Sequence, residues 1–564
     1  MGPHSALAML GPVRKTGRPE TKMQKVRALN GSFAYAVAHD MPREINLWSF
    51  FVEGMTHMKR QTLMITFHAA LMVAAASFLS SCNGGSGTPP PVPQIQNIDS
   101  STTPTSPVGL PIEINGSGFQ SAPGKVVFTP QGGTPVDAPT PSSSAWSDTG
   151  IVATVPASLT ASGTVSVTVV TSGGTSNAVT LNLVATITFN PSNMSWTTTM
   201  PLPSPQGLLT GLRAVAVPGT SNSSAFAVVT GGFNGTANTT TVWANNLNQD
   251  GTVGSTTNTT WTQITTNPLP TTLAHHAMAE ADDSNSLVAV GKRFIYVIGG
   301  QVNSTDVGGT NTVYVASVDS TAGTVGTWTA LTNTLPQPLL GLSATVHNGY
   351  LYVAGGLDSS GNPGNTVYSA PVNADGTIGT WTTATNTLLK KKSFGTMFVF
   401  GGLIYYINGD PNGSISPNNQ GVGDTDVYYA SAVRGKIGTW SLNGTTTPAD
   451  RAKGILFTAY GQVISGEGVY TGNPGSKEME TSTINSNNTT NVALNSWTGL
   501  TGALGQSPKA NVYNAAAFTS PLVFVGPSGQ VPRFLILGGQ AFTGTAGAGG
   551  ALSNVVYVNN NTTP

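Results

Sequence analysis

Few residues of this 564-residue chain can do chemistry, because only 8% are charged and only one is a cysteine. That cysteine, Cys82, lies in the stretch FLSSCNGG, and a single thiol cannot form a disulfide within the chain. Downstream of it the histidines are His275, His276 and His347, and there are five arginines. Few catalytic or ligand-binding constellations can therefore form beyond Cys82.

Two charged groups are further candidates for contact with a ligand. The first is basic and consists of Lys390, Lys391, Lys392, Arg451, Lys453 and Lys509. Such residues either attract anions or simply keep a strand edge soluble. The second is acidic, and consists of Asp410, Asp424 and Asp426 in segment 409–426. Their oxygens suit calcium, but the spacing is not that of an EF-hand, and a plain long loop is the alternative.

The composition predicts an all-β chain that must position these residues. It has 68 glycines and 37 prolines, and Thr, Ser, Asn and Val replace helix formers. The first 60 residues hold nine of the 23 bases and four of the 23 acids, so the remainder is mildly acidic. Because no basic stripe is present, nucleic acid is not expected as a partner.

The residues before Cys82 explain its isolation. Met58-Lys59-Arg60 and the apolar run QTLMITFHAALMVAAASFLSSC have the form of a secretory signal, with a basic start and small residues at the end. The run is short for a permanent membrane span. Leu79, Ser80, Ser81 and Cys82 resemble the lipobox of bacterial lipoproteins, in which the cysteine is acylated and becomes the N-terminus. The alternative is a free or buried cysteine beside an ordinary signal peptide.

This resemblance divides the N-terminal part of the chain. It implies a mis-assigned start or an extension at 1–57, a signal peptide at 58–81 and a Gly/Ser/Pro tether at 82–93. It also implies a lipid anchor in a membrane of the cell envelope. Asn83 replaces the aspartate that commonly marks inner-membrane retention in enteric bacteria, so the resemblance favours the outer membrane.

Residues 94–185 alternate apolar and polar side chains between Gly/Pro turns, as strands do. The stretches GLPIEINGSGF, VVFTP, AWSDTGIVATVP and GTVSVTVVTSGGTSNAVTL resemble an IPT/TIG domain, which is an immunoglobulin-like β-sandwich. Phe119 and Trp146 are expected in its core.

Residues 190–564 are repetitive. Tryptophans recur at 196, 261, 328, 381, 440 and 497, and are expected to pack between repeats, with a platform for stacking sugars as the alternative. Glycine pairs recur at 231–232, 299–300, 355–356 and 538–539, in altered form as Asn408-Gly409 and Ser465-Gly466. The unit from Trp328 to Trp381 predicts a four-stranded antiparallel sheet, because its Asn-Gly and Asp-Gly pairs give tight hairpin turns. With a VY pair further on, these six units resemble the kelch β-propeller. The segment around Trp196 is expected to complete the last unit and close the ring.

Matching the units by position predicts a site. Arg213, His276, Ser343, Met397, Leu456 and Asn514 then share one position at the start of the innermost strands. Polar groups that converge on a channel mouth form a small-ligand site, so Arg213, His276, Ser343 and Asn514 are the candidate ligand-binding residues. The alternative is that a strand near water tolerates polar residues.

The sequence argues against two enzyme classes. Galactose-oxidase-like kelch enzymes need a cysteine cross-linked to a tyrosine beside copper, and Cys82 lies outside the repeats. The segment NADGTIGTW lacks the second glycine of the sialidase Asp-box. We therefore expect a non-catalytic module that recognises a protein or glycan, with no cofactor and no metal. The alternative is an extracytoplasmic carbohydrate-active enzyme, similar to a sugar epimerase, with its site at the propeller mouth.

Overall fold

The computed structural model describes residues 89–559 with gaps, of which the longer are 254–259, 414–422, 469–478, 484–492, 501–511 and 543–548. Cys82, Leu79, Ser80, Ser81 and the segments 1–57 and 58–81 lie outside the described residues. The described part is all-β, as the composition predicts, with one short 3₁₀ helix η2 (Pro191–Asn193). No helix in this part is both long and apolar enough to cross a bilayer.

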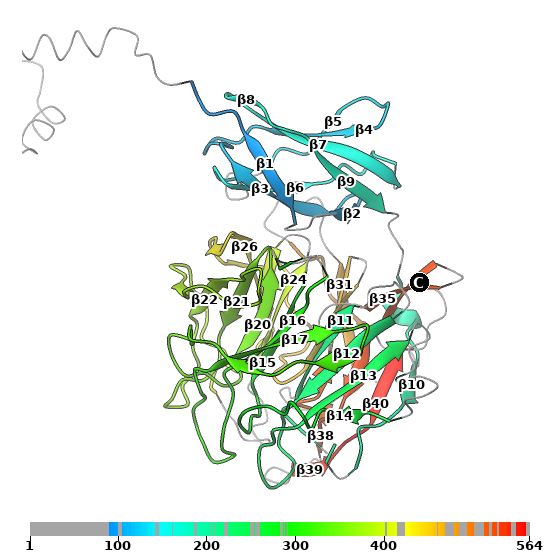
Figure 1. Cartoon of the computed structure of the whole chain (residues 1–564), viewed down its shortest axis with the longest axis vertical. Coiled ribbons are helices and arrows are strands. Elements are labelled where there is room, and N and C mark those ends of the chain that lie inside the picture. The colour runs from blue at the N-terminus through cyan, green and yellow to red at the C-terminus, as the bar shows by residue number, and fades with distance from the viewer. Residues whose placement is uncertain are drawn as a thin grey trace, which may run out of the picture. The chain divides into compact units, whose positions relative to one another are not determined.

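The first nine strands lie within 94–184 and form two sheets (Figure 1). One sheet has the order β1 (Gln94–Ile98), β3 (Pro111–Ser117), β6 (Gly150–Thr154). The other has the order β2 (Thr105–Pro107), β9 (Val179–Val184), β7 (Gly163–Thr171), β4 (Lys125–Pro130), β5 (Val136–Asp137), with β8 (Gly174–Thr175) paired to β7.

Both sheets bury their apolar faces in a common core. Along β7, Val165, Val167 and Val169 are buried, whereas the residues between them are more exposed, as the two-residue period of a strand requires. Phe119 and Trp146 belong to this core, as expected from the sequence. The Trp146 indole Nε1 donates to the backbone oxygen of Phe119 over 3.0 Å, so the buried ring leaves no polar atom unsatisfied.

The rest of the described chain contains six antiparallel sheets of four or five strands and two smaller ones. In five of the six larger sheets, the first three strands follow each other both in sequence and in space. The five sheets are β11 (Arg213–Pro218), β12 (Ser224–Thr230), β13 (Val242–Asn248), β14 (Thr262–Gln263); β15 (Ala277–Ala281), β16 (Phe294–Ile298), β17 (Val313–Asp319), β18 (Thr324–Val325), β19 (Thr329–Ala330); β20 (Ser343–His347), β21 (Tyr350–Ala354), β22 (Val367–Pro371), β23 (Thr382–Thr383); β24 (Thr396–Phe400), β25 (Leu403–Ile407), β26 (Val427–Val433), β27 (Lys436–Ile437), β28 (Ser441–Leu442); and β29 (Ile455–Ala459), β30 (Gln462–Gly466), β31 (Met479–Thr483), β32 (Thr498–Leu500).

The sixth sheet joins strands from distant parts of the chain. Its order is β34 (Ala516–Ala517), β37 (Leu535–Leu537), β40 (Val556–Asn559), β10 (Trp196–Thr199). Trp196 pairs with Asn559 and Thr199 with Val556, and Figure 1 shows β10 beside β40. The expectation that the segment around Trp196 completes the last unit is therefore confirmed.

Two small sheets accompany the last unit. They consist of β33 (Val512–Tyr513), β38 (Gln540–Phe542) and β39 (Gly549–Leu552), and of β35 (Leu522–Gly526) and β36 (Gly529–Arg533).

The sheet of β20 to β23 shows how the sequence builds each unit. Asn348 and Gly349 have φ values of 46° and 78° and connect β20 to β21. Two successive positive φ angles give the tight turn whose twist matches that of the flanking strands. The predicted four-stranded antiparallel sheet is confirmed here.

A second pair of positive φ angles follows the second strand of every unit. The pairs are 231–232, 299–300, 355–356, 408–409, 467–468 and 538–539. In the unit of β30 the pair is Glu467 and Gly468, with φ of 52° and 87°, so the prediction of Ser465-Gly466 was wrong by two residues. The second residue is glycine in all six pairs, with φ between 87° and 104°. At Gly409 a Cβ would also lie 2.9 Å from the Ser393 oxygen.

The recurring tryptophans pack between successive sheets, as expected. Trp328 shares a core with residues of β12, β13 and β16, and Trp440 shares one with residues of β21, β25 and β26. Trp261, Trp328 and Trp440 are buried. A stacking platform for sugars would require exposed rings, which these three do not offer.

Candidate functional site

Six residues that precede the first strands are linked by backbone hydrogen bonds in a cyclic order. They are Gly211, His275, Gly341, Phe394, Lys453 and Asn514, hereafter the ring residues. The N–H of each donates to the oxygen of the ring residue before it over 2.7–3.1 Å, and Gly211 donates to Asn514, which completes the cycle. All six have positive φ, between 53° and 64°. This shared conformation aims one N–H and one C=O along the cycle.

A second set of backbone bonds joins neighbouring sheets at the same level. In each case the N–H of the glycine at the second position of a positive-φ pair donates to a backbone oxygen. That oxygen belongs to the residue two positions before the next ring residue. The pairs are Gly232 to Leu273, Gly300 to Leu339, Gly356 to Lys392, Gly409 to Arg451 and Gly539 to Leu209, over 2.7–2.9 Å. The bond from Gly539 to Leu209 connects the last unit to the first.

The glycines among the ring residues make room for rings from the next position. A Cβ on Gly211 would lie 2.7 Å from the His275 imidazole, and one on Gly341 would lie 2.8 Å from the Phe394 ring. The two rings meet edge to face at 5.5 Å between centroids. The Lys453 ammonium lies 4.8 Å from the Phe394 centroid, in the geometry of a cation–π contact.

The first strands of all six sheets and three of the ring residues line one cavity of about 160 Å³. Small side chains, mainly Ala and Gly, cover much of its wall, for example Ala214, Ala277, Gly395 and Ala516. Its polar lining at the ring end comes from Arg213, Lys453, Asn514, Ser343 and Thr396. The cavity can therefore receive a small polar molecule rather than a folded partner.

Three of the four candidate ligand-binding residues lie in this cavity. Arg213 and Ser343 are the first residues of β11 and β20, and Asn514 is a ring residue. Met397 and Leu456 also line it. The predicted common position is wrong for several of these residues, because Arg213 and Ser343 lie two residues after a ring residue, Met397 and Leu456 lie three after, and Asn514 is itself a ring residue. Ser343 Oγ accepts from the backbone N–H of Met397 over 2.7 Å, so part of its bonding capacity serves the wall itself.

His276 lies outside the cavity, and its side chain is fully buried. Its Nε2 lies 2.8 Å from the Thr230 hydroxyl. Its neighbour His275 is the ring residue, and the position of His276 matches Leu212 and Leu342 in the adjacent units. The sequence prediction placed it one residue out of register because both histidines are adjacent and polar.

The ring end of the cavity is positively charged. Burial lowers the pKa of Arg213 to about 10 and that of Lys453 to about 8, the latter despite the opposing charge of Asp410. Burial, with the positive charges of Arg213 and Lys453, lowers the pKa of His275 to about 3. His275 is therefore neutral at neutral pH and feels both cations. These cations favour an anion at the ring end, whereas Glu280, the fourth residue of β15, lines the same cavity further along the strand.

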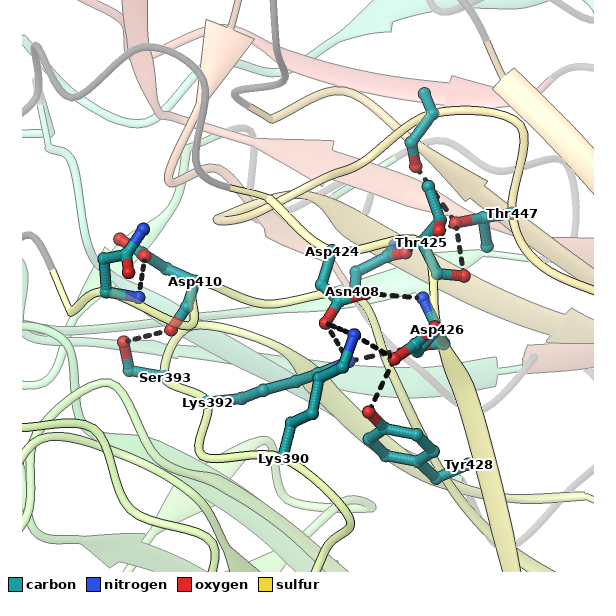
Figure 2. A network of polar contacts seen from close by, with 12 residues as sticks. Lys390, Lys392, Ser393, Asn408, Asp410, Asp424, Thr425, Asp426, Tyr428 and Thr447 are labelled. Carbon is teal, nitrogen blue, oxygen red and sulfur yellow. Dashed lines mark hydrogen bonds and ion pairs between the residues drawn. The ribbon is translucent and has the colours of Figure 1, made fainter. Parts of the chain in front are cut away.

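The basic residues before β24 form ion pairs, as Figure 2 shows. Lys390 Nζ lies 3.2 Å from Asp424 and 2.6 Å from Asp426, and Lys392 Nζ lies 3.4 Å from Asp424. Lys392 is fully buried over the Tyr428 ring, and burial lowers its pKa to about 8. Of the predicted basic group, these two lysines are thus neutralised within the protein.

The rest of the basic group is dispersed. Lys391 is exposed, and Lys509 lies outside the described residues. Arg451 is buried, with its Nε 3.1 Å from Glu480. Lys392 and Arg451 occupy the position of Leu209, Leu273 and Leu339 in other units, and that position is buried. Because a buried charge is costly without a partner, both side chains form ion pairs within the fold. Of the members of this group that the structure describes, only Lys453 lines the cavity.

The acidic candidates for calcium have other partners. Asp424 and Asp426 face the lysines, and the Tyr428 hydroxyl donates to Asp426 over 2.7 Å (Figure 2). Burial alone would raise the pKa of Asp426, but the bonds from Lys390 and Tyr428 hold it below its ordinary value. Asp410 accepts from the backbone N–H groups of Asn412 and Gly413. Within the described ranges no group of three or more His, Cys, Asp or Glu residues could hold a metal.

Sequence reasoning missed Gly211, His275, Gly341, Phe394 and Lys453 as equivalent residues. One signal was available in the sequence, because the stretches LTGL, LAHH and LLGL, which precede three of the first strands, align on their leucines. Phe394 and Lys453 break that pattern, since Lys392 and Arg451 replace the leucines. Only the hydrogen bonds reveal their equivalence.

Comparison with known protein families finds no family that matches this chain, and comparison with curated proteins finds no significant match.

Proposed function

We propose that this chain is a lipid-anchored protein of the cell envelope that binds a glycan or protein without transforming it. In this proposal 94–185 is an immunoglobulin-like domain of IPT/TIG type and 190–564 a six-bladed kelch-type β-propeller. Cys82 carries the lipid, and the tether 82–93 holds the folded part away from the membrane surface.

The observation that carries the binding role is the cavity lined by the first strands of six sheets. Supporting the propeller are the cyclic hydrogen bonds of the ring residues, the pairing of β10 with β40 and the bond from Gly539 to Leu209. Polar groups from several units meet in that cavity, and ligands commonly bind where separate units of a fold converge.

The binding role is tested with a glycan array probed by the full-length protein and by its Arg213→Leu variant. We expect retention of a defined set of glycans by the wild type and its loss in the variant. Lys391→Gln is the matched control, since Lys391 is exposed and outside the cavity. Equal retention by all three proteins contradicts a site in the cavity.

The anchor is tested by intact mass of protein from the membrane fraction. We expect a mature chain that starts at an acylated Cys82, and loss of lipid and membrane association in Cys82→Ser. Ser81→Ala keeps a small residue before the cysteine and is expected to behave as the wild type. A soluble, unmodified wild type contradicts the anchor.

The second candidate function is a carbohydrate-active enzyme with its site in the same cavity. One observation favours it, because a lysine with a pKa of about 8 is partly neutral near neutral pH and can accept a proton. Incubation with a panel of sugars, followed by NMR, decides between the two. Turnover that Lys453→Gln abolishes establishes the enzyme and overturns the non-catalytic role.

A further inference from the structure

The ring end of the cavity brings two cations and one amide together. Lys453, Asn514 and Gly211 are consecutive ring residues, and Arg213 begins its strand two residues after Gly211. Both Arg213 and Lys453 line the cavity, and both lie close enough to His275 to lower the pKa of its imidazole. The cations therefore belong to a single site.

Arg213 keeps most of its hydrogen-bonding capacity for a ligand. Its Nη1 donates to the backbone oxygen of Leu212 over 2.9 Å. Among the residues that the structure describes, no carboxylate makes an ion pair with Arg213. By contrast, the buried Arg451 is paired with Glu480. A guanidinium has five donors in a planar fork that matches a carboxylate, so an anion from outside can complete the bonding of Arg213.

Asn514 supplies the second, independent observation. The residue is 5% exposed and lines the cavity, yet among the described residues none makes a hydrogen bond to its Oδ1. A buried acceptor without a partner costs free energy unless a ligand or water donates to it. A carboxylate cannot donate, but a hydroxyl can. The site therefore suits a molecule that carries both groups.

The size of the cavity limits that molecule. The cavity volume of 160 Å³ is close to the roughly 150 Å³ of a protein cavity that binds benzene. The cavity therefore admits a small group such as one end of a sugar residue, whereas a stretch of folded polypeptide does not fit. We propose that Arg213, Lys453 and Asn514 form a subsite for a hydroxylated carboxylate, a sugar-acid residue at the end of a glycan. Arg213 and Lys453 bind the carboxylate, and Asn514 accepts from a hydroxyl. This inference rests on the proposed binding function and names its ligand class.

The test compares D-glucuronate with D-glucose, which differ at the carboxylate, by calorimetry on the full-length protein. We expect measurable binding of glucuronate, and binding of glucose at least tenfold weaker. Arg213→Gln and Lys453→Gln should each weaken glucuronate binding about 10- to 100-fold, as expected for hydrogen bonds to a charged group. Lys391→Gln should change nothing. Thermal melting checks that each variant is folded, and two separate variants keep the test decisive if one is not.

Several outcomes overturn the inference. They are equal binding of glucose and glucuronate, inorganic phosphate binding more tightly than glucuronate, no binding of glucuronate, or binding unaffected by both substitutions. One outcome separates the two proposals: the array retains neutral glycans in a way that depends on Arg213, but glucuronate does not bind. That outcome supports the proposed function and contradicts only the sugar-acid subsite. Conversely, binding of glucuronate followed by its conversion supports the subsite and overturns the non-catalytic function.

Discussion

Lys453 lines the cavity with a buried charge whose desolvation costs stability. Its ammonium is buried over Phe394, and burial lowers its pKa from 10.5 to about 8. The folded protein therefore binds fewer protons than the unfolded chain between these two pH values, so its stability rises with pH across that interval. The positive charge at neutral pH is held against a desolvation cost.

Replacing this lysine is expected to separate binding from stability. Lys453→Met removes the buried charge but keeps an unbranched side chain at the same positive φ. At pH 7 we expect the variant to be more stable by about 1–2 kcal/mol, measured by urea unfolding, because no charge is desolvated. Glucuronate binding should fall, and in the wild type it should weaken as pH rises above 8. A less stable variant contradicts this account.

His275 predicts the acid side of the stability profile. Its pKa of about 3 lies below the unfolded value of 6.5, so the unfolded chain binds more protons between these values and stability falls as pH drops below 6.5. His275→Gly places at this ring position the residue found at 211 and 341. Between pH 6.5 and 4.5 the variant should lose about 1–2 kcal/mol less than the wild type, by urea unfolding at each pH. Parallel profiles contradict a neutral, buried His275.

At the scale of elements, the glycine pairs hold each sheet to the next. The N–H of Gly409 donates to the Arg451 oxygen over 2.7 Å, and its φ is 104°. This backbone approach leaves no room for a side chain, whereas the first position of the pair accepts Asn408 and Glu467. The pair of positive φ angles recurs in every unit, whereas the amino acid at its first position varies.

Gly409→Ala is expected to cost more than an alanine at an open positive-φ glycine. The new Cβ would meet the Ser393 oxygen at 2.9 Å, in addition to the strain of its φ. We expect a loss of about 2–4 kcal/mol in unfolding free energy. Gly291→Ala, with φ of 74° and open space around its Cβ, is the control and should lose about 1 kcal/mol. Equal losses would show that the close approach is not limiting.

The lysine pair before β24 should behave as one unit. Lys390 and Lys392 both contact Asp424, so either one alone can still neutralise it. Lys390→Ala and Lys392→Leu should each change stability by less than about 1.5 kcal/mol, whereas the double variant should lose about 3–5 kcal/mol. A double-mutant cycle by urea unfolding measures the difference. Additive losses would mean that the two lysines act independently.

At the scale of the whole molecule, the first and last strands of the repeats meet in one sheet. Thr198 pairs with Tyr557, so contact between the two ends stabilises every unit between them. Within this sheet β40 is paired on both sides, by β37 and by β10, so it is not an exposed edge.

A disulfide across this junction should stabilise the protein. In a Cys82→Ser background, Thr198→Cys with Tyr557→Cys would close a loop of more than 100 residues. We expect about 3–5 kcal/mol of stabilisation when oxidised, and its loss on reduction, by thermal melting in both states. The Thr198→Cys variant alone is the control. No difference between oxidised and reduced forms would mean that opening this junction is not part of unfolding.

The sequence by itself determined the all-β class, the four-stranded pattern, the core positions of Phe119 and Trp146 and the pairing at Trp196. These follow from local rules, since strand period, turn residues and apolar spacing are written along the chain. The tertiary structure decided which residues share a position around the cavity. His276 and Ser465-Gly466 were misplaced because equivalence across units depends on hydrogen bonds between sheets. Lys453 and Glu467 also adopt a positive φ at positions where other units have glycine, so the residue type does not mark these positions. The tertiary structure also decided which charged side chains form ion pairs, because the partners of Lys392 and Arg451 are distant in sequence and only folding brings them together. Arg213, in contrast, lines the cavity.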